Sequence, residues 1–198
     1  MSSPVVAEVT YLQDPAHRRK HTHRQVFGAA AAIVGARPEP AVAELSMAEL
    51  AARARIDPST VSAHFASIDA MFAELYLNRV YELPLTVDPR AGARARVSAQ
   101  LRAVTLVLAD EPLLAAACAR ALLRDGDAAV AAVRTRVAAE VHRRTAAALG
   151  MGAWPEVLDT VQTMFWGALL QVQTSVMSYH AMADRLDTML ALILPDTD

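Results

Sequence analysis

Apolar side chains recur every three or four residues along most of this chain, a spacing that places them on one face of an α-helix. The first such segment spans residues 17–34 and precedes a stretch, 35–45, that contains a glycine and two prolines. No segment alternates apolar and polar residues for long, so no strand is predicted. The pattern therefore predicts an all-α protein with about nine helices.

Two short helices are predicted next, each with its own start signal. Ser46 and Glu49 form a Ser-x-x-Glu capping box, in which the serine hydroxyl accepts the Glu49 amide. Asp57 can cap the second helix, and Pro58 suits its first position because the missing N–H costs nothing there. About three residues separate the two helices, in which Leu50, Val61 and Phe65 are expected to face inward. This spacing is typical of a helix-turn-helix, here over residues 46–65.

The rest of the chain has a helical pattern as well. One helix is expected between Ser67 and Pro84, and four apolar stripes follow. The first residues of these stripes are Val97, Val130, Leu158 and Met182. Segment 157–177 is apolar almost all round, which implies burial on more than one side. A subunit interface shared with the last helix and an intramolecular core both explain this segment, and the sequence leaves both open.

The composition agrees with a globular helical protein. Of the 198 residues, 54% are hydrophobic, 20% are charged and only 5% are aromatic, a balance that favours helices over a β-sandwich. The net charge of −2 gives no general argument for nucleic acid. Residues 17–68, however, hold seven basic and four acidic side chains, a difference of +3, whereas residues 84–198 hold 11 and 12, a difference of −1. This asymmetry fits a DNA-binding N-terminal part, and a solvated charged face explains it equally well.

A single cysteine, Cys118, excludes an intrachain disulfide and a cysteine zinc cluster, and it fits a reducing compartment. Its apolar neighbours predict a buried side chain. Residues 1–16 show neither periodicity nor a signal-peptide pattern, so we expect a flexible arm there. The longest apolar run, MFWGALLQV, is much shorter than the roughly 18 residues of a membrane span. We therefore expect a cytoplasmic protein.

The segment ELAARARIDPSTVSAHFASIDAMF, residues 49–72, resembles the core of the TetR family of bacterial transcriptional regulators. The matching positions are Leu50, Ala51, Ala54, Ile56, Thr60, Val61, His64, Phe65 and Ser67. Upstream, VFGAAAAIV is similar to the apolar first helix of the family. The resemblance is specific over roughly residues 20–80 and implies an all-α fold in which a three-helix DNA-binding domain precedes a larger helical bundle.

Five positions depart from the family pattern. Arg55 and Ser59 stand in the places of two glycines, and Asp57 stands in the place of the serine cap. Ser62 replaces the tyrosine of the recognition helix, and Ile68 replaces a lysine. Since the family typically uses that tyrosine and lysine on phosphates, the resemblance implies that two backbone anchors are missing here.

The resemblance implies a DNA-binding domain over residues 17–83 and a ligand-binding and dimerisation domain over 84–198. It further implies a homodimer, formed through the last two helices, that binds a double-stranded operator as a repressor and needs no cofactor. Contacts to DNA are expected from Arg18, Arg19, Lys20, Arg24, Ser46, Arg53, Arg55, Pro58, Ser59, Thr60, Ser62, Ala63 and His64. Base contact is expected around Pro58, Ser59 and Ala63, whose small side chains allow a close approach.

A small apolar effector is the second partner that the resemblance implies. Its contacts are expected from the larger or polar side chains that interrupt apolar helices, namely Tyr76, Arg102, Thr105, Trp166 and Gln171. For each of them, an ordinary place in the core or at an interface is the competing interpretation. The scarcity of charges in TMFWGALLQVQTSVM favours an apolar ligand of modest size.

Other functions find less support in the sequence. Metal binding by His17, His21 and His23 is disfavoured by the cations beside them. Glu140 and His142 lie on different faces of a helix, and no Glu-x-x-His pair or glycine-rich phosphate loop is present, so no enzyme is expected. The remaining alternative is a ligand-binding or protein-interaction module of the same fold that has lost operator binding.

Overall fold

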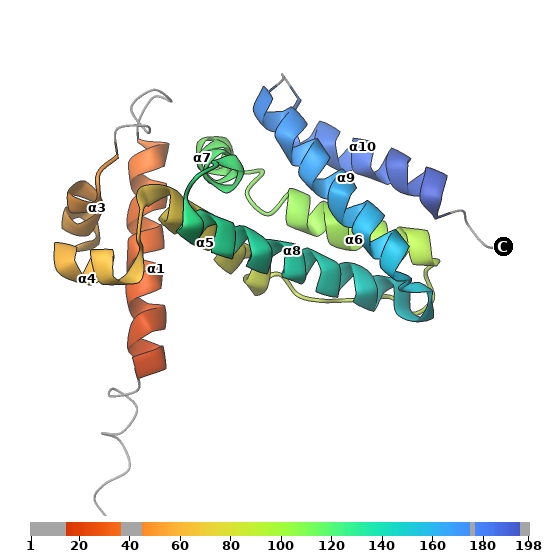
Figure 1. Ribbon diagram of the computed structural model, residues 1–198, viewed down its shortest axis with the longest axis horizontal. Coiled ribbons are helices and arrows are strands. Elements are labelled where there is room, and N and C mark those ends of the chain that lie inside the picture. The colour runs from red at the N-terminus through yellow and green to blue at the C-terminus, as the bar shows by residue number, and fades with distance from the viewer. Residues whose placement is uncertain (1–14, 37–44, 175–176, 195–198) are drawn as a thin grey trace, which may run out of the picture. The chain divides into compact units, whose positions relative to one another are not determined.

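The computed structural model describes residues 15–36, 45–174 and 177–194, which contain nine α-helices, one short 3-10 turn and no strand (Figure 1). The helices are α1 Pro15–Gly35, α3 Met47–Ala54, α4 Pro58–His64, α5 Ile68–Glu82, α6 Ala93–Thr105, α7 Pro112–Leu123, α8 Ala128–Leu149, α9 Pro155–Thr174 and α10 Tyr179–Ile193. The all-α prediction is therefore confirmed. Of the expected flexible arm, residues 1–14 lie outside the described residues, and the last two already belong to α1.

The chain divides into two compact units, residues 1–68 and 69–198. The first unit contains α1, α3 and α4, and the second contains α6–α10 with nearly all of α5. Our predicted domain boundary lies at the end of α5 instead, because the sequence does not show which core this helix joins. The structure ties α5 to the second unit. The Tyr76 hydroxyl donates to the Val104 carbonyl of α6 at 3.3 Å, and Arg144 of α8 binds the C-terminal end of α5.

In the first unit, α1 packs against α3 and α4. Its buried apolar side chains are Val26, Phe27, Ala29, Ala30, Ile33, Val34, Leu45, Leu50, Ala51, Val61 and Phe65. The ring centroids of Phe27 and Phe65 lie 5.8 Å apart, and the His23 ring contacts both. This small core holds α4 in place and buries Leu50, Val61 and Phe65, as their apolar spacing predicts.

In the second unit, α6 packs against α8 and α10, while α9 contacts α7, α8 and α10. The residues that open the four predicted apolar stripes are all buried, as is Cys118. α9 buries one face only, through Leu158, Val161, Phe165, Ala168 and Leu169. None of the described helices has the length and hydrophobicity needed to cross a membrane.

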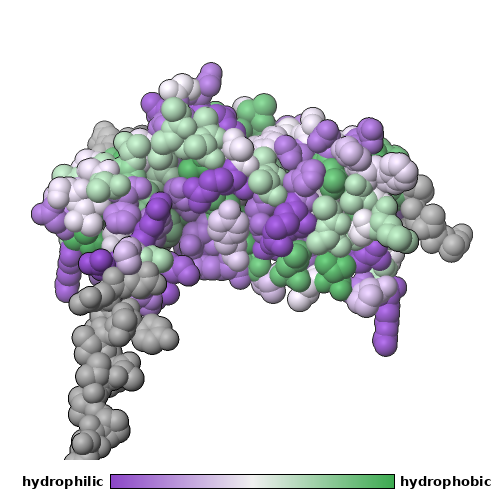
Figure 2. Space-filling view, turned by 60° about the horizontal axis from the view of Figure 1, so that its bottom comes forward, coloured by the Kyte–Doolittle hydropathy of each residue, from purple (hydrophilic) through white to green (hydrophobic). Residues whose placement is uncertain are grey.

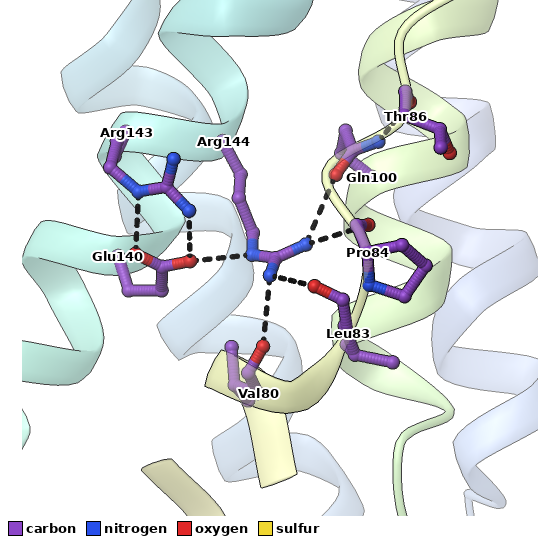
Figure 3. A network of polar contacts seen from close by, with 8 residues as sticks. All are labelled: Val80, Leu83, Pro84, Thr86, Gln100, Glu140, Arg143 and Arg144. Carbon is purple, nitrogen blue, oxygen red and sulfur yellow. Dashed lines mark hydrogen bonds and ion pairs between the residues drawn. The ribbon is translucent and has the colours of Figure 1, made fainter. Parts of the chain in front are cut away.

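A single arginine, Arg144 on α8, ties three elements together inside the second unit (Figure 3). Its side chain is 2% exposed, and its Nη2 donates to the carbonyls of Val80 (2.9 Å) and Leu83 (2.7 Å) at the end of α5. A helix leaves such carbonyls without partners of its own. The Nε donates to the Glu140 carboxylate at 2.7 Å, and Nη1 donates to the Gln100 side chain of α6 at 3.3 Å. Arg144 therefore fixes the C-terminal end of α5 to α6 and α8.

The acidic partner in this network, Glu140, is 5% exposed. A buried ion pair is tolerated only when hydrogen bonds satisfy its polar atoms, and Glu140 also accepts two bonds of 2.7 Å from Arg143. Burial alone would raise the pKa of Glu140, but the hydrogen bonds from Arg143 and Arg144 lower it below its ordinary 4.5. Sequence reasoning missed this network, although Glu140 and Arg144 have the four-residue spacing of ion pairs on one helix face.

Candidate nucleic-acid interface

The interface begins at the N-terminus of α3, which Ser46 caps. The Ser46 Oγ accepts the Glu49 amide at 3.2 Å, so this bond of the predicted capping box is confirmed. Leu50 and Ala51 are fully buried on the inner side of the helix, while Arg53 is exposed in its last turn. The cap leaves the Ser46 side chain exposed at the helix start, where amides and dipole favour an anion.

The turn between α3 and α4 is built on Arg55, which adopts a left-handed conformation with φ 57° and ψ 43°. Its amide donates to the Ala52 carbonyl at 3.2 Å, and the Ile56 amide donates to the Ala51 carbonyl at 3.0 Å. These bonds pair two carbonyls at the end of α3. The left-handed residue that makes such bonds possible is usually a glycine. A residue with a Cβ is strained in this region by roughly 1–2 kcal/mol. The turn therefore keeps its geometry without glycine and carries an exposed cation.

The short helix α4 begins with the two predicted start residues. The Asp57 carboxylate accepts the Ser59 amide at 2.8 Å, and Pro58 occupies the first turn. Hydrogen bonds from the Ser59 hydroxyl and amide lower the pKa of Asp57 below its ordinary 3.8. Pro58, Ser59, Ser62 and Ala63 are exposed, whereas Val61 is fully buried. The outward face of α4 is consequently made of small side chains, which a DNA groove can admit.

Two other α4 side chains that were expected to contact DNA, Thr60 and His64, are less exposed than Pro58, Ser59, Ser62 and Ala63. Thr60 and His64 are half-buried. The His64 ring lies edge-on to the His23 ring of α1, with centroids 5.3 Å apart. Among the described residues, no group of three histidine, cysteine or acidic side chains is placed to hold a metal ion.

Exposed basic side chains lie on α1 and at the C-terminal end of α3. Arg18, Arg19, Lys20 and Arg24 lie exposed in the N-terminal half of α1, within the helix predicted over residues 17–34. The described part of the first unit holds six basic and two acidic residues, a difference of +4. Arg19, Lys20, Arg24, Arg53 and Arg55 form no ion pair with any described residue. Such cations can attract and neutralise an external polyanion.

Two of the five expected effector residues line one cavity in the second unit. Tyr76 of α5 and Thr105 of α6 face it together with Tyr179 of α10 and Leu169 of α9. Tyr179 was not predicted, because its position just after the Ser178 cap gives no sign of which space its ring enters.

The other three expected effector residues do not line this cavity. Arg102 is exposed and pairs with Asp184 of α10 at 2.8 Å. Trp166 is half-buried with its ring edge-on to Phe165, and Gln171 is exposed. These three side chains do not point into the core of the second unit. A polar or large residue within an apolar run does not show by itself whether its side chain faces inward or outward.

α9 and α10 each carry a large apolar residue that is exposed. Leu170 is 50% exposed and Leu192 is 82% exposed. Gly167, one helical turn before Leu170, has open space where a Cβ would stand. Scattered exposed apolar residues are normal on protein surfaces. On the face drawn in Figure 2, small groups of hydrophobic residues lie between hydrophilic ones. The α9–α10 residues differ in lying on the two helices for which the sequence leaves a subunit interface open.

Comparisons with known proteins agree with this geometry. No model of a known protein family matches the chain. Two curated relatives, uncharacterised HTH-type transcriptional regulators of Mycobacterium tuberculosis and Mycobacterium bovis, are each 41% identical over 178 residues, covering 89% of this chain and 82% of theirs. The crystal structure of a TetR transcriptional regulator from Rhodococcus sp. RHA1 matches with a TM-score of 0.70 at 18% identity, covering 87% of this chain and 97% of that one. At this identity the structural likeness shows the fold.

The helix-turn-helix, its exposed cations and these relatives define a DNA-binding transcriptional regulator, which is a non-enzymatic class of protein. The chain belongs to the same family as these HTH-type transcriptional regulators, and it has the fold of a TetR regulator.

Proposed function

We propose that this regulator is a homodimeric repressor of the cytoplasm, which binds a palindromic operator and leaves it when a small apolar effector binds. The observation that carries the proposal is the unpaired charge of the first unit. Five exposed cations there have no partner in the described chain, and they accompany a helix with small outward side chains. Phosphates of duplex DNA would neutralise these cations, and each contact releases counterions.

Within the interface we assign two kinds of contact. Pro58, Ser59 and Ala63 form the exposed, small-residue face of α4 that would approach base edges in the major groove. Ser46, Arg55, Thr60 and His64 would bind phosphates, with Thr60 and His64 contributing only through their exposed edges. Arg53 and Ser62 are exposed and supply further donors beside these residues.

The small size of a single helix-turn-helix favours a dimer. A single helix-turn-helix offers few base contacts, and a twofold dimer that reads two half-sites about 34–36 Å apart is the usual solution. We assign the dimer contact to α9 and α10, where Leu170 and Leu192 are exposed and Gly167 would let a partner helix approach closely. The effector would act from the cavity of the second unit, and it must bind the two conformations of the dimer with different affinity to move the equilibrium.

The decisive experiment is a salt titration of DNA binding, measured by fluorescence anisotropy on a fragment of the gene's own promoter. We expect log K to fall linearly with log salt, by about 0.9 for each phosphate neutralised. Serine replacement of Arg53 should lower the slope and weaken binding. Replacing Arg120, an exposed arginine of α7, should change neither and serves as the matched control.

One alternative is supported by a specific observation. Ile68 is half-buried and Ser62 is short, so neither can replace the phosphate anchors that the family usually has at these positions. A helical ligand-binding or protein-interaction module that has lost operator binding would show no salt-dependent affinity for any promoter fragment. That outcome would rule out the repressor and favour the module.

A further inference from the structure

The outward face of α4 has no side chain of the kind that binds one base through two hydrogen bonds. The helix contains no arginine, lysine, asparagine or glutamine, the residue types that read guanine or adenine in this way. Its longest polar side chain, His64, is half-buried, and its ring lies edge-on to the His23 ring of α1. The exposed side chains of α4 are Pro58, Ser59, Ser62 and Ala63. Sequence readout by this helix therefore depends on single contacts from short side chains.

Ser59 presents its side-chain oxygen to the outside as an acceptor. Its hydroxyl donates to the Asp57 carboxylate, and its amide donates to the same carboxylate oxygen at 2.8 Å. Because these bonds lower the pKa of Asp57, the carboxylate stays ionised at physiological pH and continues to accept the serine proton. A hydroxyl has a single proton but two acceptor sites, so the Ser59 oxygen can still accept a hydrogen bond. A base edge that faces Ser59 must therefore offer a donor, which is the amino group of adenine or cytosine.

Ala63 places a methyl group beside this acceptor. It follows Ser59 by four residues, so the two exposed side chains share one face of α4. On the other side of the helix, Val61 is 0% exposed and Phe65 is 2% exposed, which fixes the face in position. In the major groove a T·A pair shows the thymine methyl group and the adenine amino group, whereas a C·G pair has no methyl group and shows two guanine acceptors. An acceptor next to a methyl group therefore matches T·A.

We propose that α4 reads a T·A base pair in each half-site of the operator, with the Ala63 methyl group against the thymine methyl group and the Ser59 oxygen accepting the adenine amino group. This inference rests on the proposed function, because it names the base pair that the operator presents to α4. The exposed cations Arg53 and Arg55 contribute affinity through phosphates, which carry no sequence information directly. Ser59 and Ala63 thus determine specificity at this pair.

The test begins with selection of binding sites from a random duplex library, using the full-length protein, and continues with base analogues in the selected half-site. We expect every enriched half-site to contain the T·A pair. Replacing its thymine by uracil removes only the 5-methyl group, so affinity measured by fluorescence anisotropy should fall about fourfold for each half-site. Ala63→Gly removes the methyl group on the protein side. This variant should bind the thymine and uracil duplexes equally.

Ala52→Gly provides the matched control. Ala52 is an exposed alanine of the neighbouring helix α3, so the substitution makes the same chemical change in a helix but leaves the α4 face intact. The fourfold preference for thymine over uracil should remain in this variant. Because the measured quantity is the ratio of two affinities of one variant, a loss of helix stability in Ala63→Gly does not imitate the expected result.

A second pair of variants tests the hydrogen bond. Replacing the adenine of the same pair by purine removes the amino group, so affinity of the unmodified protein should fall roughly fivefold for each half-site. Ser59→Ala should bind the adenine and purine duplexes equally. Ser62→Ala changes another exposed serine of α4 and should keep the fivefold difference.

The inference and the proposed function fail in different ways. Enriched half-sites built on guanine without the T·A pair would overturn the inference, since an arginine beside α4 would then read the bases. A uracil effect that persists in Ala63→Gly, or a purine effect that persists in Ser59→Ala, would also overturn it. All three results leave operator binding intact. A library from which no sequence is enriched would overturn both the inference and the repressor.

Discussion

The two units differ in how many of their basic side chains form ion pairs within the chain. In the first unit, Arg19, Lys20, Arg24, Arg53 and Arg55 are exposed and form no ion pair with the described chain. In the second unit, six arginines form ion pairs with carboxylates of the chain itself, namely Arg79, Arg102, Arg124, Arg136, Arg143 and Arg144. The same kind of side chain is therefore left without a partner among the described residues of the first unit and is paired within the chain at these six positions of the second.

This contrast explains why net charge is a poor guide to function here. The whole chain carries −2, and the excess of basic residues near the N-terminus is only a few charges. Paired cations contribute little field outside the molecule, because the carboxylate beside each one cancels most of its charge. What distinguishes the first unit is that five of its exposed cations pair with no described carboxylate, a property that a count of residues reports only partly.

The largest effect is expected where a cation is buried. Arg144→Met removes the donors that bind Val80 and Leu83 and leaves Glu140 buried with a single cationic partner. Removing one partner of a buried pair typically lowers stability by about 3–5 kcal/mol. Urea denaturation should therefore show a large decrease in the free energy of unfolding.

The control for this change is a paired arginine at the surface. Arg136 binds Glu74 through two hydrogen bonds but is 48% exposed, so Arg136→Met should lower stability by less than about 1 kcal/mol. Similar decreases in the two variants would mean that burial does not set the importance of these pairs.

In the first unit, removing cations should affect DNA binding and leave stability unchanged. The double change Arg19→Ser and Lys20→Ser should reduce operator affinity roughly tenfold at physiological salt and lower the salt slope by about 0.9 for each phosphate that is no longer neutralised. The free energy of unfolding should stay within about 0.5 kcal/mol, because both side chains are exposed and form no ion pair with the described residues. A decrease in stability with an unchanged slope would show that these cations serve the fold.

Arg55 allows charge and strain to be separated at one position. Arg55→Gly removes the cation and relieves the left-handed strain, so it should weaken DNA binding while raising stability by up to about 1 kcal/mol. Arg55→Ala removes the cation and keeps the strain, so it should weaken DNA binding equally without the increase in stability. Thermal unfolding and anisotropy on both variants make the comparison. Equal stability of the two would show that the turn is not strained.

The sequence predicted those parts of the fold that local chemistry determines. The Ser46 and Asp57 caps, the burial of Val61 and Phe65, and the absence of strands among the described residues all follow from side-chain preferences within a few residues. Contacts between distant segments were beyond such reasoning. The Arg144 network joins residues more than forty positions apart, and its bonds connect α5 to the second unit.

The effector residues show the same limit. Tyr76 and Thr105 were identified because each interrupts an apolar stripe, and both do line a cavity. Arg102 interrupts a stripe in the same way but pairs with Asp184 at the surface. Whether such a residue turns inward depends on the helices packed around it, which the sequence pattern of its own helix does not contain.

The smallest expected effect is that of Asp57→Asn, which is compared with Glu140→Gln because both carboxylates have a lowered pKa and each unit holds one of them. A carboxylate whose pKa is lower in the folded protein stabilises it above the ordinary value, 4.5 for Glu140 and 3.8 for Asp57, and loses this effect as pH falls through the folded pKa. Glu140→Gln should lower stability at pH 7 and flatten its decrease below pH 4.5, because the buried pair with Arg144 is absent at every pH. Asp57→Asn should barely change stability at pH 7, since asparagine caps a helix as well as aspartate does, and should remove only the small decrease below pH 3.8. Urea midpoints measured from pH 7 to pH 3 compare the two variants, and a larger effect from Asp57→Asn would contradict the view that the second unit depends on its internal charges while the first does not.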